Sequence, residues 1–424
     1  MDEVDFRMNI EHAARYLDFN SDSWEIFHEI EYQKVLKIEK NRLSSLIDDV
    51  EEGIAVRVIN DSKVGFAYTT DPDSIISACE MAVKISRVSE DRLSDFPEGG
   101  AAMVDGIFSE KVVETIKQPE WLYETGKRMT AIADEEKVNL TEGVIELSAS
   151  KTRILNSTGT EVEKEETAVS VFVECVSESG SAYDVAYSRD LDLDVENVVR
   201  NSSLFSKQTD EKIDSGEYNV VFSPLAVHQL LNYALYPAFF ADNVLKGRSM
   251  LKDKLGEKIF SDISIIDDGT ADSLLMSSPF DDEGVESRRS YIIKDGVLEG
   301  FINDWKSSIE LNGEPTGNGI RIERNSFPAT SATNMILEIE EESEYDSAIY
   351  VHSLTGAHTS NPVSGDFSLQ CSNLLFNGKP VKPVMISGNV YDLLKKAEYG
   401  GKEKIQVENT YTGWIEFSDV RIRS

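Results

Sequence analysis

The chain has 424 residues, and its 77 Asp and Glu against 42 Lys and Arg give a formal net charge of −35 at pH 7. This charge argues against direct nucleic-acid binding, because phosphates are repelled unless basic side chains gather in a stripe, and the basic runs at 246–258 and 321–324 are short and broken by acids. Hydrophobic residues make up 40% of the chain, which is enough for a sizeable core, so we expect a globular protein of about two to three domains.

Neither a membrane span nor a disulfide framework is expected. The sequence has no run of about 18 apolar residues, and its acidic first six residues are unlike a secretory signal, so we expect a cytoplasmic protein. The three cysteines, Cys79, Cys175 and Cys371, form no CxxC pair and are odd in number. They are therefore predicted to be small buried thiols.

The first segment, residues 1–98, is predicted to be an α+β unit. Residues 4–17 have helical spacing, the runs 24–30 and 54–59 alternate as strands do, and residues 71–85 begin with Asp-Pro-Asp before apolar residues at helical spacing. A Pro- and Gly-bearing stretch at 94–100 marks a linker.

Residues 105–212 repeat this plan in a second α+β unit. The patterns predict a helix over 119–136, strands over 144–150 and 151–156, a hairpin turn at 156–160 and an alternating strand over 168–174.

The third segment, residues 215–424, is predicted to be a large β domain rich in hairpins. The turns Lys-Asp-Gly-Val at 294–297 and Asn-Gly-Lys-Pro at 377–380 carry the chemistry that tight hairpins favour. The expected fold class is therefore α+β, with mainly antiparallel sheets, covering helices and a hairpin-rich C-terminal β domain.

Three consecutive acids, Asp281, Asp282 and Glu283, stand between Pro279 and Gly284. The backbone must turn while it holds three acceptor-only side chains together, and this suits binding of a cation, a basic residue or backbone amides. A solvated surface turn is the simpler alternative, since acidic runs are usually exposed.

With its surroundings, this acidic turn resembles a known family signature. Ser-Pro-Phe-Asp-Asp-Glu-Gly-Val at 278–285 is followed by the Arg pair at 288–289, the run 293–301 and Thr-Gly-Asn at 316–318, and together they resemble the TldD/PmbA family, often labelled modulators of DNA gyrase. The similarity continues in order through 364–368, 377–378, 383–384 and 386–389, so it covers nearly the whole chain.

The resemblance implies a cytoplasmic metalloprotease of two related subunits. The TldD type holds zinc through a helical HExxxH motif and a C-terminal cysteine, and the PmbA or TldE type lacks these ligands; two His on one helical face bind the metal while Glu activates its water. The matching positions in this chain are Asn232, Tyr233 and Pro237, or, in a shifted register, His228, Gln229 and Tyr233. Neither register supplies the motif, so the chain is expected to resemble PmbA/TldE, without catalytic or metal-binding residues, with zinc in a partner subunit.

The role implied for such a subunit is to shape a peptide-substrate channel beside a TldD-like partner. Edge strands of the C-terminal sheet would present hydrogen-bonding groups to an extended peptide. The residues predicted to contact substrate or partner are Asp281, Asp282, Glu283, Gly284, Asn318, Asn361, Ser364, Gly365 and Asp366. Each loop could equally be an intramolecular turn in which Asp binds local amides.

Two other functions stay open on the sequence alone. The first is a non-enzymatic, homodimeric peptide-binding or scaffold protein. The second is a peptidase with a different catalytic set, in which His352 or His358 pairs with Ser353, Ser360 or Asp366. Their spacing does not decide this, because a triad is recognised by geometry.

Overall fold

The computed structural model describes residues 3–339 and 347–424. Its helices are α1 (Glu3–Asn20), α2 (Ile75–Ser86), α3 (Glu110–Lys117), α4 (Glu120–Glu135), α5 (Val195–Ser206), α6 (Pro224–Ala234), α7 (Ala241–Leu245), α8 (Trp305–Leu311) and α9 (Val390–Leu394), with short 3₁₀ turns η1 (Pro72–Ser74), η2 (Tyr236–Phe239) and η3 (Ala357–Thr359).

The strands up to residue 188 are β1 (Ser23–Glu39), β2 (Arg42–Asn60), β3 (Lys63–Thr69), β4 (Asn139–Asn156), β5 (Glu161–Val176) and β6 (Ser181–Ser188). The later strands are β7 (Gly216–Phe222), β8 (Ile263–Asp268), β9 (Arg289–Lys294), β10 (Val297–Leu298), β11 (Gly319–Ile320), β12 (Ala329–Thr330), β13 (Met335–Ile339), β14 (Ile349–Thr355), β15 (Asp366–Phe376), β16 (Lys379–Pro380), β17 (Val384–Asn389), β18 (Ala397–Gly400), β19 (Ile405–Val407), β20 (Thr410–Thr412) and β21 (Ile415–Arg423).

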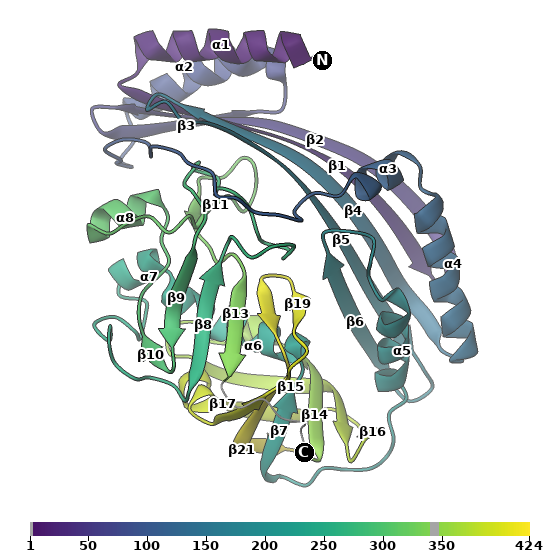
Figure 1. The fold of residues 1–424 in the computed structure, drawn as a ribbon. Coiled ribbons are helices and arrows are strands. Elements are labelled where there is room, and N and C mark those ends of the chain that lie inside the picture. The colour runs from purple at the N-terminus through teal and green to yellow at the C-terminus, as the bar shows by residue number, and fades with distance from the viewer. Residues whose placement is uncertain (1–2, 340–346) are drawn as a thin grey trace.

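A long antiparallel sheet joins the first two segments of the chain. Its order is β3-β2-β1-β4-β5-β6, and β1, β2, β4 and β5 are each 16 to 19 residues long. Strand β1 pairs with β4 from Glu25 opposite Asn156 to Ile38 opposite Gly143, so the linker at 94–100 separates two parts of one sheet. Figure 1 shows this sheet arching over the C-terminal part of the chain.

The two faces of the long sheet differ because side chains alternate along each strand. On the outer face, Trp24 and Ile26 pack with α1 and α2, while Leu36 and Ile38 pack with α3 and α4. The inner face carries charged residues together with Phe27, and it looks toward the C-terminal part. The alternation thus places a polar, concave surface opposite the acidic turn.

The C-terminal residues form two further large sheets around one core, and β11 and β12 form a small two-stranded sheet. One sheet has the order β10-β9-β8-β13-β20-β19, and in the other β14, β7, β21, β17 and β15 pair in succession and close into a ring because β15 also pairs with β14. Helix α6 belongs to this core through buried side chains such as Leu230 and Leu231. The pairs β7–β14 and β13–β20 are parallel, and the remaining pairs are antiparallel.

The predicted fold class is confirmed: the protein is α+β, with mostly antiparallel sheets and covering helices. The predicted turns join β4 to β5, β9 to β10 and β15 to β16. All three cysteines are buried thiols. Among the described helices, none has the length and apolar character needed to cross a membrane.

One strand prediction is wrong. The runs 144–150 and 151–156 were expected as two strands, but they form the single strand β4. The outward-facing positions of β4 change from apolar residues to Lys151 and Arg153, but its pairing with β1 continues without interruption. Both cations pair with acids of β5 on an uncovered part of the outer face.

Candidate functional site

The acidic turn lies between the long sheet and the C-terminal part of the chain. Phe280, directly before the acids, is fully buried against Phe27, Ala55 and Ile154 of the inner face. The Lys164 ammonium of β5 lies 5.3 Å from the centre of the Phe280 ring. The turn is therefore an internal contact, and the alternative of a solvated surface turn is wrong.

Asp281 holds the turn in shape. Its Oδ1 accepts hydrogen bonds from the amides of Glu283 (2.9 Å) and Val285 (3.0 Å), and its Oδ2 accepts one from the amide of Gly319 (2.8 Å). Burial and the neighbouring charge of Glu283 raise the pKa of Asp281. Three amide donors occupy this carboxylate, which matches the capping role that the sequence left open.

Glu283 joins a buried ion network that links the two parts of the chain. Its Oε1 lies 3.0 Å from Arg57 Nη1, and its Oε2 accepts a hydrogen bond from the Trp305 amide at 2.7 Å. Arg57 also forms two bonds with Glu25, of 2.8 and 2.6 Å, and Arg321 Nη2 lies 3.0 Å from Glu25. We call Glu25, Arg57, Glu283 and Arg321 the charge clamp.

Burial governs the charges of the clamp. It opposes the charge of Arg57, but Glu25 and Glu283 outweigh it, so the pKa of Arg57 is raised. Burial, and then repulsion by Arg57, lowers the pKa of Arg321 to about 10. Burial raises the pKa of Glu283, although Arg57 acts in the opposite direction. At neutral pH both arginines keep their charge, so each side of the clamp depends on the other.

Asp282 is the member of the acidic turn that faces open space. It is half-buried, and its Oδ2 accepts a hydrogen bond from the Arg321 amide at 2.8 Å. With Glu29 of β1 it lines two neighbouring cavities of about 230 Å³ and 600 Å³. We call these the small and the large cavity, and together they form a polar cleft between the inner face of the long sheet and the C-terminal part.

The small cavity contains charges of both signs. Its lining includes Lys164, Glu166 and Arg189, with Lys164 Nζ 3.0 Å from Glu166 and 2.8 Å from the hydroxyl of Ser278. Burial opposes the charge of Lys164, yet Glu166 and Asp282 outweigh it and raise its pKa. A polar ligand would meet both donors and acceptors there.

Asn318 lies under this cleft and does not open into it. Its amide nitrogen donates to Asp267 Oδ2 and to the Ser331 carbonyl, both at 2.9 Å. The side chain is fully buried, and its Oδ1 has no hydrogen-bond partner among the described residues. Asn318 therefore supports the loop that carries Gly319.

The second predicted loop, residues 361–366, is a separate surface feature. Asn361 Oδ1 accepts from the amides of Val363 and Ser364, and Asp366 accepts from the Ser364 hydroxyl (2.7 Å) and from Asn389 (2.9 Å). Gly365 adopts a φ of +79° with Tyr391 against it, so a side chain there would be strained and would clash. Within the described residues, no hydrogen bond or ion pair joins this loop to residues 281–284.

The side chains at the helical position of the family motif take part in internal hydrogen bonds. On α6, His228 Nδ1 lies 3.0 Å from Thr410 Oγ1, and its Nε2 lies 3.4 Å from Glu408. Gln229 bonds to Tyr183 and accepts from the Leu354 amide at 2.6 Å. These side chains do not fit an HExxxH zinc site, because Gln229 is not a base and Tyr233 replaces the second His. Over the described ranges, no cluster of three or more His, Cys, Asp or Glu has a metal-binding arrangement.

The histidines of the alternative catalytic set are not arranged as a triad. His352 Nε2 lies 3.1 Å from Asp184 and its ring stacks on Phe205 at 4.4 Å, while the Ser353 hydroxyl donates to Asn373 at 2.7 Å. His358 is exposed on η3. In the described part of the chain, no hydrogen bond joins either His ring to Ser353, Ser360 or Asp366.

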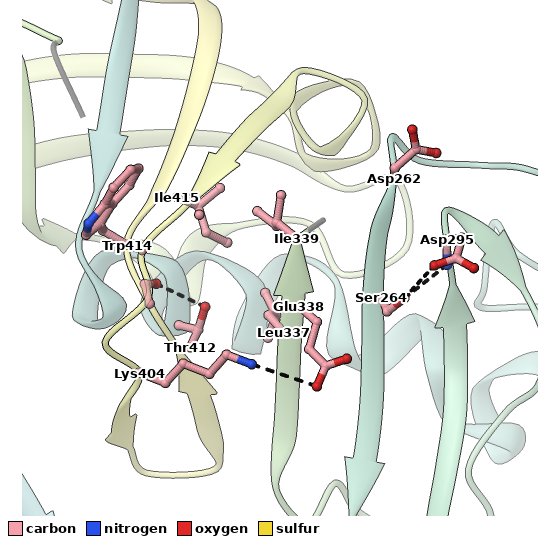
Figure 2. A pocket seen from close by; sticks show the side chains of 13 residues that line it. Asp262, Ser264, Asp295, Leu337, Glu338, Ile339, Lys404, Thr412, Trp414 and Ile415 are labelled. Carbon is pink, nitrogen blue, oxygen red and sulfur yellow. Dashed lines mark hydrogen bonds and ion pairs between the residues drawn. The ribbon is translucent and has the colours of Figure 1, made fainter. Parts of the chain in front are cut away.

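A third pocket lies away from all predicted site residues. Figure 2 shows it between β8, β13 and the strands near Trp414. Its volume is about 400 Å³. Its acids already have internal partners: Glu338 lies 3.8 Å from Lys404, and Asp295 accepts from the Ser264 hydroxyl at 3.4 Å.

Sequence reasoning missed the charged partners of the acidic turn. Glu25 and Arg57 sit directly opposite each other on β1 and β2, at positions that face inward. The signal that could have found them is a charged residue on each of two strands whose neighbours are apolar, since buried charges occur in pairs.

The comparisons with known proteins agree with this geometry. Family models match three stretches: the PmbA/TldA metallopeptidase domain 1 at 24–86, the central domain at 114–207 and the C-terminal domain at 215–424. An uncharacterized protein of Methanocaldococcus jannaschii is 33% identical over 86% of this chain and 88% of its own length. A metalloprotease of Methanothermobacter thermautotrophicus is 26% identical over 83% of this chain and 82% of its own.

A solved structure of the same family has the same fold. TldE from Thermococcus kodakarensis superposes with a TM-score of 0.90 at 26% identity, and the match covers 98% of this chain and all of that one. The fold and the sequence matches therefore define a protein of the metallopeptidase-like class. The chain belongs to the PmbA/TldD family.

Proposed function

We propose that this chain is the subunit without the HExxxH site in a two-subunit metallopeptidase of the PmbA/TldD type, and that a TldD-like partner supplies zinc and cleaves the peptide. The observation that carries this proposal is the state of α6. Its His228 and Gln229 bond to Thr410, Tyr183 and the Leu354 amide, and Tyr233 stands where a second metal-binding His is needed.

The polar cleft supports a role in shaping the substrate channel. Asp282 lines both cavities, so it is the predicted residue best placed to accept hydrogen bonds from a peptide. We assign Asp281, Glu283 and Asn318 to holding the cleft wall. Their side chains are occupied by hydrogen bonds or ion pairs with Gly319, Arg57 and Asp267, respectively. The exposed loop 361–366 is assigned to partner contact.

The test is peptide hydrolysis by the purified chain, by an HExxxH-bearing relative from the same organism, and by their mixture, with zinc measured on each sample. We expect the mixture to cleave faster than the sum of the two separate samples, and zinc to be found with the relative only. A matched control is the same mixture made with a relative whose motif Glu is replaced by Gln, which should not cleave.

Three other outcomes contradict the proposal. Hydrolysis by the chain alone that survives chelation would point to a different catalytic set. Stoichiometric zinc on this chain would mean that the argument from α6 is wrong. A stable homodimer that neither binds the relative nor alters its activity would favour the peptide-binding scaffold.

A further inference from the structure

The loop between β11 and β12 crosses from the C-terminal part to the inner face of the long sheet. Figure 1 shows β11 reaching up toward that sheet. At the base of the loop, Arg321 belongs to the charge clamp, with its guanidinium 4.6 Å from the centre of the Phe27 ring and its side chain 2% exposed. The base is therefore fixed by a buried contact.

The tip of the loop is held by one guanidinium. Arg324 Nε lies 2.7 Å from Glu29 Oε1, and its two terminal nitrogens bond to Glu31 and Glu51. These three carboxylates come from β1 and β2, and the Arg324 side chain is only 16% exposed. The tip thus places one positive charge among three negative ones.

The other contacts of the loop tip are few. Ile322 is 87% exposed, and Phe327 is 42% exposed with its ring 4.7 Å from Phe66. The bonds of Glu323 and Ser326 stay within the loop. Ion pairs and one ring contact therefore attach the tip to the sheet.

The loop also forms part of the cleft wall. Residues 321–325 line the large cavity, and Glu29, which binds Arg324, lines both cavities together with Asp282. Arg324 itself lines only the large cavity, next to the residues that the two cavities share. If Arg324 left Glu29, the large cavity would lose part of its wall beside Asp282.

We propose that residues 321–327 are an ion-paired strap across the cleft, which opens when Arg324 is released and so widens the large cavity beside Asp282. Glu51 is 53% exposed, and ion pairs at such positions are weakened by dissolved salt. The surplus of carboxylates also lets a competing cation replace Arg324. This strap goes beyond the proposed function and needs no partner subunit.

Trypsin offers a direct test, because it cleaves after arginine and can reach the 324–325 bond only when the strap is open. The variant to compare with the wild type carries Glu31→Gln and Glu51→Gln, which weakens the hold on Arg324 and keeps Glu29 in the cleft. If opening is fast, cleavage tracks the open population, and we expect the rate after Arg324 to rise about tenfold at low salt.

The matched control is Glu52→Gln, which removes one carboxylate from β2 on its other face, where Glu52 pairs with His28. It should leave cleavage after Arg324 unchanged. Raising NaCl from about 0.05 to 0.5 M should speed cleavage after Arg324 in the wild type, because salt weakens the ion pairs of Arg324. The double variant should respond less, because it has lost two of these three ion pairs.

Equal cleavage of the wild type and the double variant at low salt would overturn the proposal. Hydrogen exchange of residues 322–327 in the unmodified protein provides a second measurement that no folding defect can affect. Faster exchange in salt is expected at these amides, and exchange that does not change with salt would also overturn the strap. Neither trypsin cleavage nor hydrogen exchange depends on peptidase activity of the protein. The strap can therefore fail its test while the proposed function passes, and the reverse.

Discussion

Asp267 is a carboxylate buried without a cation. It is 1% exposed, and it accepts hydrogen bonds from the amide and hydroxyl of Thr333, at 2.7 and 2.9 Å, and from Asn318 at 2.9 Å. Burial outweighs these bonds and raises its pKa to about 6 from an ordinary 3.8. The folded protein therefore binds a proton here more tightly than the unfolded chain does.

The stability contributed by Asp267 should fall as the pH rises. Because the folded pKa is raised, the contribution is fully present below about pH 4 and is lost as the pH passes through about 6. We expect Asp267→Asn to remove this pH dependence. The difference in unfolding free energy, variant minus wild type, should therefore increase by up to about 3 kcal/mol between pH 4 and pH 7.

Urea unfolding of both proteins across that pH range measures the gain. After a flip, Asn318 Oδ1 can accept from the new amide, at the cost of the Asn318 bond to the Ser331 carbonyl. That cost does not vary with pH, so the pH dependence is the quantity to compare. The exposed Asp392, which pairs with Lys395, provides the control Asp392→Asn. A difference between the wild type and Asp267→Asn that stays constant with pH would contradict the assignment.

Single residues were predictable from the sequence only where their partners are local. The capping by Asp281 follows from its position two and four residues before the amides that it binds. Arg57 and Glu283 are 226 residues apart, and no periodicity or composition connects them. The fold alone brings that pair together.

At the scale of elements, the segment before the acidic turn depends on Phe280. Because this ring is fully buried in a small cluster between the sheet and the C-terminal part, Phe280→Ala should lower the unfolding free energy by about 3–5 kcal/mol. Thermal or urea unfolding measures the loss. Phe280→Leu should cost less, and Ala at the 89% exposed Phe19 should change stability by no more than about 0.5 kcal/mol.

The positions of strands β1, β2, β4 and β5 and of three hairpin turns were predictable, because alternation and Gly-containing turns are local signals. The length of these strands could not be predicted from the sequence. Strands β1 and β2 run past their apolar residues into charged ones such as Lys34 and Asp48, which pair with each other across the strands. Helices α3 and α5 were also missed. Helix α3 has only 8 residues, and the buried face of α5 includes Ser202, Ser203 and Ser206, which interrupt its apolar pattern.

At the scale of the whole molecule, the charge clamp joins the long sheet to the C-terminal part. Glu25 is shared by Arg57 and Arg321, so Glu25→Gln leaves the buried Arg321 without its ion-pair partner in the clamp. Removing one partner of such a network costs about 3–5 kcal/mol. We expect a loss of that size in calorimetry or urea unfolding.

Glu217→Gln is the control for the clamp, because Glu217 pairs with Arg421 at the surface and both are more than half exposed. Its loss should stay below about 1 kcal/mol. Equal effects of the two substitutions would show that the clamp adds no more than a surface pair.

The ring of strands in the C-terminal sheet has a consequence for synthesis of the protein. Its last strand, β21, comprises 9 residues at the very end of the sequence and lies between β7, which opens the C-terminal segment, and β17. A nascent chain therefore cannot close the ring until β21 has been made, long after its neighbour β7. A stop codon before residue 415 would therefore remove an interior strand of this core, and the sheet could not close.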